Sequence, residues 1–249
     1  MQTVIIGSGN VAYHLARALV EIKLPPVQIF GRNESELQTI SNELKIPYST
    51  KNLVNSDIYL ICVSDNAVEE VSQLITKKDV LVAHTSGSLP KDILKGDYRK
   101  ASFYPLQTFS KSKVPDYSKI PFFIEAENEK DRTLLFELAS GISENVMEST
   151  YEKRKYIHLT AVFACNFVNH LFSRAKEISD SQEIPFDYFL PLIDETVQKI
   201  HEIEPQAAQT GPAVRNDRRI LELHEQLLKD ESLEIYKTMN HSIQKMYEL

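Results

Sequence analysis

Short apolar runs alternate with amphipathic segments through the first 149 residues of the chain. The runs are rich in β-branched residues, as in strands that are buried on both faces of a parallel sheet. Between them, apolar positions recur at helical spacing. This alternation predicts an α/β fold with a doubly wound, mostly parallel sheet. The expected strands are residues 3–6, 27–30, 57–63, 80–84, 100–104, 121–125 and 145–148, and the expected helices start near residue 11 and span 33–44, 64–75 and 130–139.

The pattern changes after Thr150, where helical periodicity replaces the strand-like runs. Helices are expected at residues 151–181, 186–203, 214–228 and 233–247, separated by Pro185, Glu204-Pro205, Gly211-Pro212 and the polar residues 230–232. We therefore predict an α/β domain over residues 1–149 and an all-helical domain over residues 150–249. Four amphipathic helices carry more apolar surface than one small sheet can cover, so we expect a homodimer through the helical domain.

A glycine-rich turn joins the first expected strand to the first helix. The stretch Gly7-Ser8-Gly9-Asn10-Val11-Ala12 fits the G-x-G-x-x-A fingerprint of Rossmann domains, with a strand on either side of the first helix. The first glycine allows a tight turn, the second lets the backbone approach a pyrophosphate, and the helix N-terminus offers free N–H groups. We expect a dinucleotide to bind here, and the alternative is a domain that has lost its ligand. The expected binding residues are Gly7, Ser8, Gly9, Asn10 and Val11.

The end of the second strand indicates which dinucleotide binds. NAD sites usually place a carboxylate there to hold the ribose 2′-hydroxyl, but this chain has Gly31-Arg32-Asn33. A guanidinium can bind a 2′-phosphate with two hydrogen bonds, so NADP (NADPH) is the expected cofactor, with Arg32 and Asn33 as ligands. Alternatively, Arg32 stacks on the adenine or is solvated, and Asn33 only caps the next helix. Val63 and Ser64, which follow another strand, are expected to pass the cofactor's ribose.

Composition excludes several classes of function. The formal net charge is −7 and no basic run occurs, so a nucleic-acid partner is not expected. Cys62 and Cys165 lie in separate apolar runs and lack metal-ligand spacing, so neither a metal site nor a disulfide framework is expected. The chain shows no signal-peptide pattern and no apolar run long enough for a membrane span. A cytoplasmic protein without a membrane partner is therefore expected.

Five motifs together resemble a known family: the glycine motif, His84-Thr85-Ser86-Gly87-Ser88, Tyr104-Pro105-Leu106-Gln107-Thr108-Phe109, the helix over residues 158–166, and Gly211-Pro212-Ala213-Val214-Arg215-Asn216-Asp217. The chain resembles the 6-phosphogluconate dehydrogenase-like superfamily, which includes pyrroline-5-carboxylate reductases. Within it, the chain is most similar to bacterial Rossmann-like NADP oxidoreductase-type proteins with a C-terminal domain of unknown function. The resemblance implies NADP binding and a helical second domain, and it implies no particular substrate.

One departure from the superfamily matters for the chemistry. Hydroxyisobutyrate-type dehydrogenases carry a catalytic Lys four residues before an Asn on the long helix. Here Asn166 has Val162 at that position, and no Lys–Asn pair with this spacing occurs on the helix. The proton donor of that group therefore cannot be transferred to this chain.

Two polar clusters follow strands of the expected sheet, where ligands bind in open α/β folds. His84-Thr85-Ser86 should lie near the nicotinamide, and His84 and Ser86 could bind or protonate a substrate oxygen. Alternatively, His84 is a packed strand-end residue and the serines of this turn only cap a helix. After the next strand, Gln107 is expected to line a substrate pocket.

The long helix carries a third cluster. Lys155, His158, Val162 and Asn166 share one face if the helix keeps 3.6 residues per turn. His158 could supply the proton that hydride transfer to a carbonyl or imine needs, with Lys155 and Asn166 as further catalytic candidates. The alternative is a polar seam at a domain or dimer interface.

The last candidate cluster precedes the third C-terminal helix. Gly211-Pro212 is expected to begin that helix, and Arg215 could hold an anionic group of the substrate. The alternative is an ion pair between Arg215 and Asp217.

The sequence therefore favours an NADP-dependent oxidoreductase that transfers a hydride between NADPH and a small polar metabolite. The alternative is a non-catalytic NADP-binding sensor or regulatory protein. A methyltransferase is disfavoured because Gly31-Arg32 stands where such sites usually place an acid.

Overall fold

A computed structural model describes all of residues 1–249. The chain forms two compact units, Met1–Asn166 and Phe167–Leu249, which are described separately below. All strands lie in the first unit. The last strand ends at Glu148 and the next helix begins at Tyr151, so the change from strands to helices falls where the hydrophobic pattern changes.

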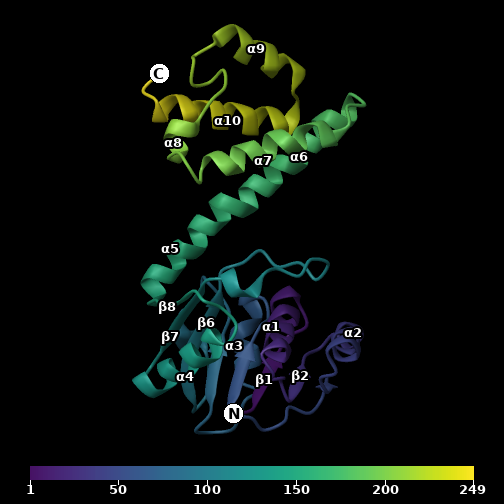
Figure 1. The fold of residues 1–249 in the computed structure, drawn as a ribbon, viewed down its shortest axis with the longest axis vertical. Coiled ribbons are helices and arrows are strands. Elements are labelled where there is room, and N and C mark those ends of the chain that lie inside the picture. Colours follow the sequence, from purple (N-terminus) through teal and green to yellow (C-terminus); the bar gives the residue numbers. More distant parts are fainter. The chain divides into compact units, whose positions relative to one another are not determined.

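The first unit is built on one eight-stranded sheet with the order β3-β2-β1-β4-β5-β6-β7-β8 (Figure 1). Every neighbouring pair is parallel except β6 and β7. The strands are β1 (Thr3–Ile6), β2 (Gln28–Phe30), β3 (Tyr48–Ser49), β4 (Ile58–Ile61), β5 (Leu81–His84), β6 (Arg99–Pro105), β7 (Phe122–Ala126) and β8 (Val146–Glu148).

Helices cover both faces of this sheet, because each central strand is apolar on both sides. Ile5 faces the core that contains α1 (Asn10–Glu21), α2 (Glu34–Leu44) and α4 (Glu129–Ser140). Its neighbours Val4 and Ile6 face the opposite core, which contains α3 (Asp65–Ser72). This alternation is the period-two geometry of a strand. The predicted doubly wound, mostly parallel fold is confirmed.

In three places the first unit differs from what the sequence pattern indicates. The pair Tyr48–Ser49 forms β3 at the sheet edge, where two residues are too few to give a sequence pattern. The helix predicted through Ile75 ends at Ser72, whose hydroxyl bonds back to the carbonyl of Glu69. The helix that the serines of the 84–88 turn would cap in the alternative does not form, since only a single 3₁₀ turn follows Pro90, η1 (Lys91–Ile93).

The predicted long helix over residues 151–181 is not uniform. It consists of α5 (Tyr151–Ala161), a π-helical segment at Val162–Phe167, and α6 (Val168–Ser181). Thr150 caps its start by accepting a hydrogen bond from the backbone N–H of Lys153. A π segment holds more residues per turn than an α-helix, so it rotates the side chains that follow it.

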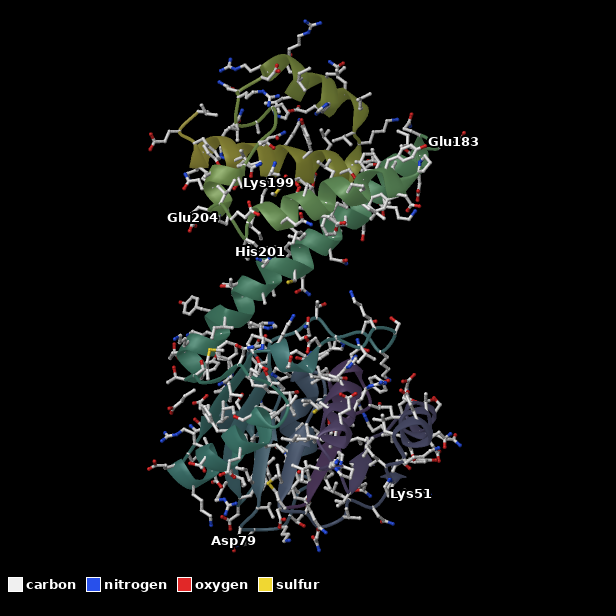
Figure 2. All side chains as sticks on the ribbon, in the orientation of Figure 1. Lys51, Asp79, Glu183, Lys199, His201 and Glu204 are labelled. Atoms are coloured by element: carbon white, nitrogen blue, oxygen red, sulfur yellow. The ribbon has the colours of Figure 1, made fainter.

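The second unit is all-helical, as predicted. Its further elements are η4 (Phe186–Phe189), α7 (Leu190–Lys199), α8 (Pro205–Ala208), α9 (Arg218–Leu227) and α10 (Asp230–Met246). His201 and Glu204 lie exposed between α7 and α8 (Figure 2). No helix of the protein is both long and apolar enough to cross a membrane.

The predicted start of α9 at Gly211-Pro212 was wrong. The helix begins at Arg218, and Asp217 caps it by accepting a hydrogen bond from the N–H of Ile220. Asn216 has a φ of 51°, in the left-handed region, so the backbone before the cap cannot continue as a right-handed helix. No helix N-terminus therefore stands at Gly211 to attract an anion.

Candidate functional site

A cavity of about 310 Å³ opens at the carboxyl ends of β1, β2 and β4. Ligands of open α/β sheets bind at this edge. Of the nine predicted cofactor-binding residues, seven line the cavity; the two exceptions are Asn10 and Val11. The residues that line it are Ile6, Gly7, Ser8, Gly9, Phe30, Gly31, Arg32, Asn33, Cys62, Val63, Ser64, Ala67, Glu70, Val71 and Leu74.

The two glycines of the turn are required for different reasons. Gly7 has a φ of 137°, and a Cβ there would lie 2.3 Å from the carbonyl oxygen of Cys62, so the fold itself excludes a side chain. A Cβ on Gly9 would meet no atom within 4 Å. Protein packing therefore does not explain Gly9. Open space above this glycine fits the close approach of a dinucleotide pyrophosphate, which the fingerprint predicts.

The β2–α2 turn presents Arg32 to solvent at the rim of this cavity, with no carboxylate partner. Asn33 acts as the N-cap of α2, since its Oδ1 accepts hydrogen bonds from the N–H of Glu36 and the hydroxyl of Ser35. Asn33 therefore has the capping role that the alternative predicted, and it also lines the cavity. Residues 67, 71 and 74 of the α3 region give the cavity an apolar wall suited to an adenine ring.

The two remaining residues of the fingerprint lie just outside the cavity. The side-chain amide of Asn10 donates to the carbonyl oxygen of Phe109, 2.9 Å away. Val11 is partly buried against the core under α1. Both belong to the first turn of α1, where the free backbone N–H groups lie.

A second cavity, of about 570 Å³, lies between the segment after β6 and helix α5 with its π segment. It contains three predicted site residues, His158, Asn166 and Gln107. No Asp, Glu, Lys or Arg side chain lines it. Its lining residues are Tyr104, Leu106, Gln107, Thr108, Ile157, His158, Thr160, Ala161, Ala164, Cys165 and Asn166.

The chemistry of this cavity centres on Tyr104 and His158. The Tyr104 hydroxyl lies 2.9 Å from Nδ1 of His158, and the two rings pack edge to face. Burial raises the pKa of Tyr104 to about 12, so its hydroxyl keeps its proton at neutral pH. In the sequence Tyr104 stood out only as part of a family motif, because nothing in the sequence showed that β6 and α5 meet.

His158 also contacts the turn after β5. A Cβ on Gly87 would lie 2.8 Å from the His158 side chain, so glycine is needed for this close approach. The 84–88 turn and the long helix therefore meet in the structure. The contact is made through Gly87, whose role the sequence did not suggest.

The π segment changes which residues face the cavity. Asn166 lines it together with His158, as predicted, but Val162, which uniform spacing places on the same face, does not. Lys155 also lies outside this lining. Its ammonium is 2.5 Å from Glu152 and stacks on the rings of Tyr151 and Tyr156. The face predicted from uniform helical spacing is thus divided, with His158 and Asn166 in the cavity and Lys155 away from it.

Two other predicted catalytic residues, His84 and Ser86, accept hydrogen bonds inside the 84–88 turn. His84 is fully buried, and its Nδ1 accepts the N–H of Ser86, which leaves the ring proton on Nε2. Burial, aided by the charge of Arg154, lowers the pKa of His84 to about 4. The Ser86 hydroxyl oxygen accepts hydrogen bonds from the N–H groups of Ser88 and Leu89. His84 therefore takes the packed strand-end position that the alternative reading described.

Arg154 is a central residue that the sequence analysis missed. Its side chain is fully buried, and its two terminal nitrogens donate at 2.6 Å to the Glu125 carboxylate and to the carbonyl oxygen of Leu89. Arginine is seldom buried without a partner, but the partner here is 29 residues away on β7. These bonds fix α5 one turn before His158.

The remaining candidates lie apart from this chemistry. Arg215 is exposed in the second unit and forms no ion pair with Asp217. Burial raises the pKa of Cys62 to about 12, so this thiol is unreactive. No three His, Cys, Asp or Glu side chains converge as metal ligands.

Comparison of the chain with known proteins shows which family it resembles. Residues 2–87 match the family model described as NADP oxidoreductase coenzyme F420-dependent, and residues 120–243 match a domain of unknown function, DUF2520. No curated protein matches the sequence significantly. Among solved structures, the putative NADP oxidoreductase BF3122 from Bacteroides fragilis is 38% identical, with a TM-score of 0.93 over 98% of both chains.

More distant structures share the fold. Protein TM1727 from Thermotoga maritima is 21% identical over 99% of this chain and 98% of its own, with a TM-score of 0.71. A reductive aminase from Aspergillus terreus, solved with NADPH, is 12% identical over 98% of this chain and 94% of its own, also with a TM-score of 0.71. The chain belongs to the family of Rossmann-like NADP oxidoreductase-type proteins that carry a C-terminal domain of unknown function.

Proposed function

We propose that this protein is an NADP-dependent oxidoreductase that reduces a carbonyl or imine group of a small polar metabolite. The observation that carries the proposal is the Tyr104–His158 hydrogen bond, which lies in a cavity beside the Gly87 turn of the dinucleotide-binding unit. When bound, NADPH supplies the hydride. Residues 7–11, 32–33 and 63–64 hold the cofactor in this proposal.

The chain must then supply a proton to the reduced oxygen or nitrogen. Tyr104 suits this role because its hydroxyl is protonated at neutral pH and lines the cavity. In the direction of reduction, the Tyr104 Oη–H bond breaks as the proton moves to the substrate. Oη then takes up a proton from solvent, relayed through His158, whose Nδ1 lies 2.9 Å away.

The other predicted site residues have separate roles in this proposal. Asn166 and Gln107 orient the substrate by hydrogen bonding, since both line the cavity with amide side chains. Ser86 and His84 fix the 84–88 turn from inside. Lys155 and Arg215 have no part in the proton transfer.

The test is turnover of NADPH by absorbance across a panel of keto acids, aldehydes and imines. With an active substrate, Tyr104→Phe should lower kcat about a hundredfold or more, because general acids usually contribute that much. NADPH binding should be unchanged. His158→Gln should also lower kcat, and a change confined to KM would make either residue a binding group instead.

Two outcomes would contradict this assignment. Full activity in Tyr104→Phe would exclude its hydroxyl as the acid. Tight NADPH binding with no turnover over the whole panel would favour the non-catalytic sensor.

We also propose that two copies of the chain associate through the helical unit. On α7, Leu192 is 64% exposed and Val197 is 47% exposed, and Ile200 just after the helix is 52% exposed. Such apolar surface is typical of an interface. Sedimentation should show a dimer that Leu192→Asp disrupts, whereas Met147→Asp on β8 of the first unit should not. A monomeric unmodified protein would overturn this proposal.

A further inference from the structure

Lys111 lies on the segment between β6 and η2 (Tyr117–Lys119), and its ammonium joins two parts of the nucleotide-binding edge. Its Nζ donates to the carbonyl oxygen of Ser8, 2.8 Å away, and forms an ion pair with the Glu36 carboxylate. Ser8 belongs to the glycine turn and lines the cofactor cavity. Glu36 lies in the first turn of α2.

These two partners place the cation beside the predicted phosphate ligands. The backbone N–H of Glu36 is capped by Asn33, which follows Arg32, and both of these residues line the cavity. Lys111 therefore adds a second cation beside the glycine turn, next to the cavity whose rim carries Arg32. Its side chain is 29% exposed, so a ligand can reach it. An ammonium has three protons, and Ser8 and Glu36 engage two of them.

The segment that carries Lys111 is held in place by other contacts. The Asn10 amide donates to the carbonyl oxygen of Phe109, and the His14 ring stacks on Phe109 with centroids 4.8 Å apart. His14 Nε2 also lies 2.9 Å from the carbonyl oxygen of Ser110. The backbone next to Lys111 thus has its own anchors, and the lysine side chain is not needed to fix it.

We propose that Lys111 binds the 2′-phosphate of NADP together with Arg32, and thereby contributes to the choice of NADP over NAD. The proposal rests on the NADP-binding function proposed above. A phosphate offers more negative charge and more acceptor oxygens than the Glu36 carboxylate. The flexible lysine stem lets the ammonium exchange Glu36 for the phosphate while its bond to Ser8 remains.

The experiment measures binding of NADPH and NADH by calorimetry to the full chain and to Lys111→Ala. We expect the variant to lose about tenfold in NADPH affinity and to keep its NADH affinity, since a charge-assisted hydrogen bond is lost only with NADPH. Adenosine 2′,5′-bisphosphate and 5′-AMP serve as further probes, and only binding of the bisphosphate should weaken. Lys113→Ala is the matched control, because Lys113 is exposed on the same segment and forms no ion pair.

A second variant separates this role from a structural one. Glu36→Gln removes the competing carboxylate, so NADPH should bind at least as tightly as to the unmodified protein. If the Lys111–Glu36 pair only stabilises the fold, both variants should weaken NADPH and NADH equally and lower the melting temperature. That result, or unchanged NADPH affinity in Lys111→Ala, would overturn the proposal.

The same measurements distinguish failure of the proposed NADP binding from failure of the proposed role of Lys111. Equal affinity of the unmodified protein for NADPH and NADH would overturn both proposals. An NADPH preference that Arg32→Ala removes and Lys111→Ala does not would overturn only the role of Lys111.

Discussion

Nη1 of Arg154 donates to Oε2 of Glu125 at 2.6 Å, in a pair whose arginine side chain is fully buried. Glu125 lies on β7 and Arg154 on α5, so this bond ties the long helix to the sheet. His158 follows Arg154 by one helical turn and meets Gly87 and Tyr104. The position of His158, the hydrogen-bond partner of the proposed proton donor Tyr104, therefore depends on an ion pair that does not itself line the cavity.

Breaking this pair should cost stability. Arg154→Met removes the close partner of the Glu125 carboxylate, which is 18% exposed, and leaves it only Lys91 at 3.9 Å, so we expect a loss of about 3 kcal/mol in the free energy of unfolding. Arg132→Met is the matched control, since Arg132 and Glu148 are 37% and 60% exposed. That control should cost less than about 1 kcal/mol. Urea unfolding followed by circular dichroism measures both, and equal losses would show that Arg154 does not anchor the helix.

The two glycines of the fingerprint should respond differently to substitution. Gly9→Val should abolish dinucleotide binding and cost at most about 1 kcal/mol of stability, because its Cβ meets no protein atom and valine is only a poorer N-cap than glycine. Gly7→Ala should destabilise the fold itself, since its Cβ would clash with the Cys62 carbonyl. Calorimetry and thermal unfolding separate the two effects. Undiminished NADPH binding by Gly9→Val would make the motif a structural relic.

Arg32 should account for most of the preference for NADPH. Arg32→Ala should weaken NADPH about ten- to a hundredfold and leave NADH unchanged, because a charge-assisted hydrogen bond to the 2′-phosphate is lost. Lys78→Ala controls for net charge, since Lys78 is exposed and pairs with Asp97 away from the cavity. Calorimetric titration of both nucleotides is the measurement, and an unaltered NADPH-to-NADH ratio in Arg32→Ala would contradict the prediction.

His84 should make the fold sensitive to mild acid. Burial lowers its pKa from 6.5 to about 4, so between these values the unfolded chain binds a proton that the folded protein does not. Stability therefore falls as the pH drops below 6.5, by about 2 kcal/mol at pH 5 from this group. Urea unfolding at pH 7 and pH 5 measures the difference. His84→Gln should show a smaller loss between the two pH values, and an equal loss would show that His84 is not responsible.

The sequence determined the fold class and the nucleotide edge of the site. Apolar runs that alternate with amphipathic segments specify a doubly wound sheet by local pattern alone. Gly7, Gly9 and Arg32 could be placed because strand, turn and helix are adjacent in the chain, and the cavity now includes all three. The resemblance to Rossmann-like NADP oxidoreductase-type proteins was likewise carried by contiguous motifs, and it is confirmed.

Only the tertiary structure decided the rest, because it depends on contacts between distant segments and on helix irregularity. Tyr104 and His158 are 54 residues apart, and no local pattern shows that they meet. The π segment at Val162–Phe167 interrupts the uniform helix on which Val162 and Asn166 were predicted to share a face, and only Asn166 of these two lines the cavity. Burial also removes His84 from the proposed proton transfer. The sequence could not show this, because a histidine at the end of a strand has the same sequence context whether its ring faces solvent or the core.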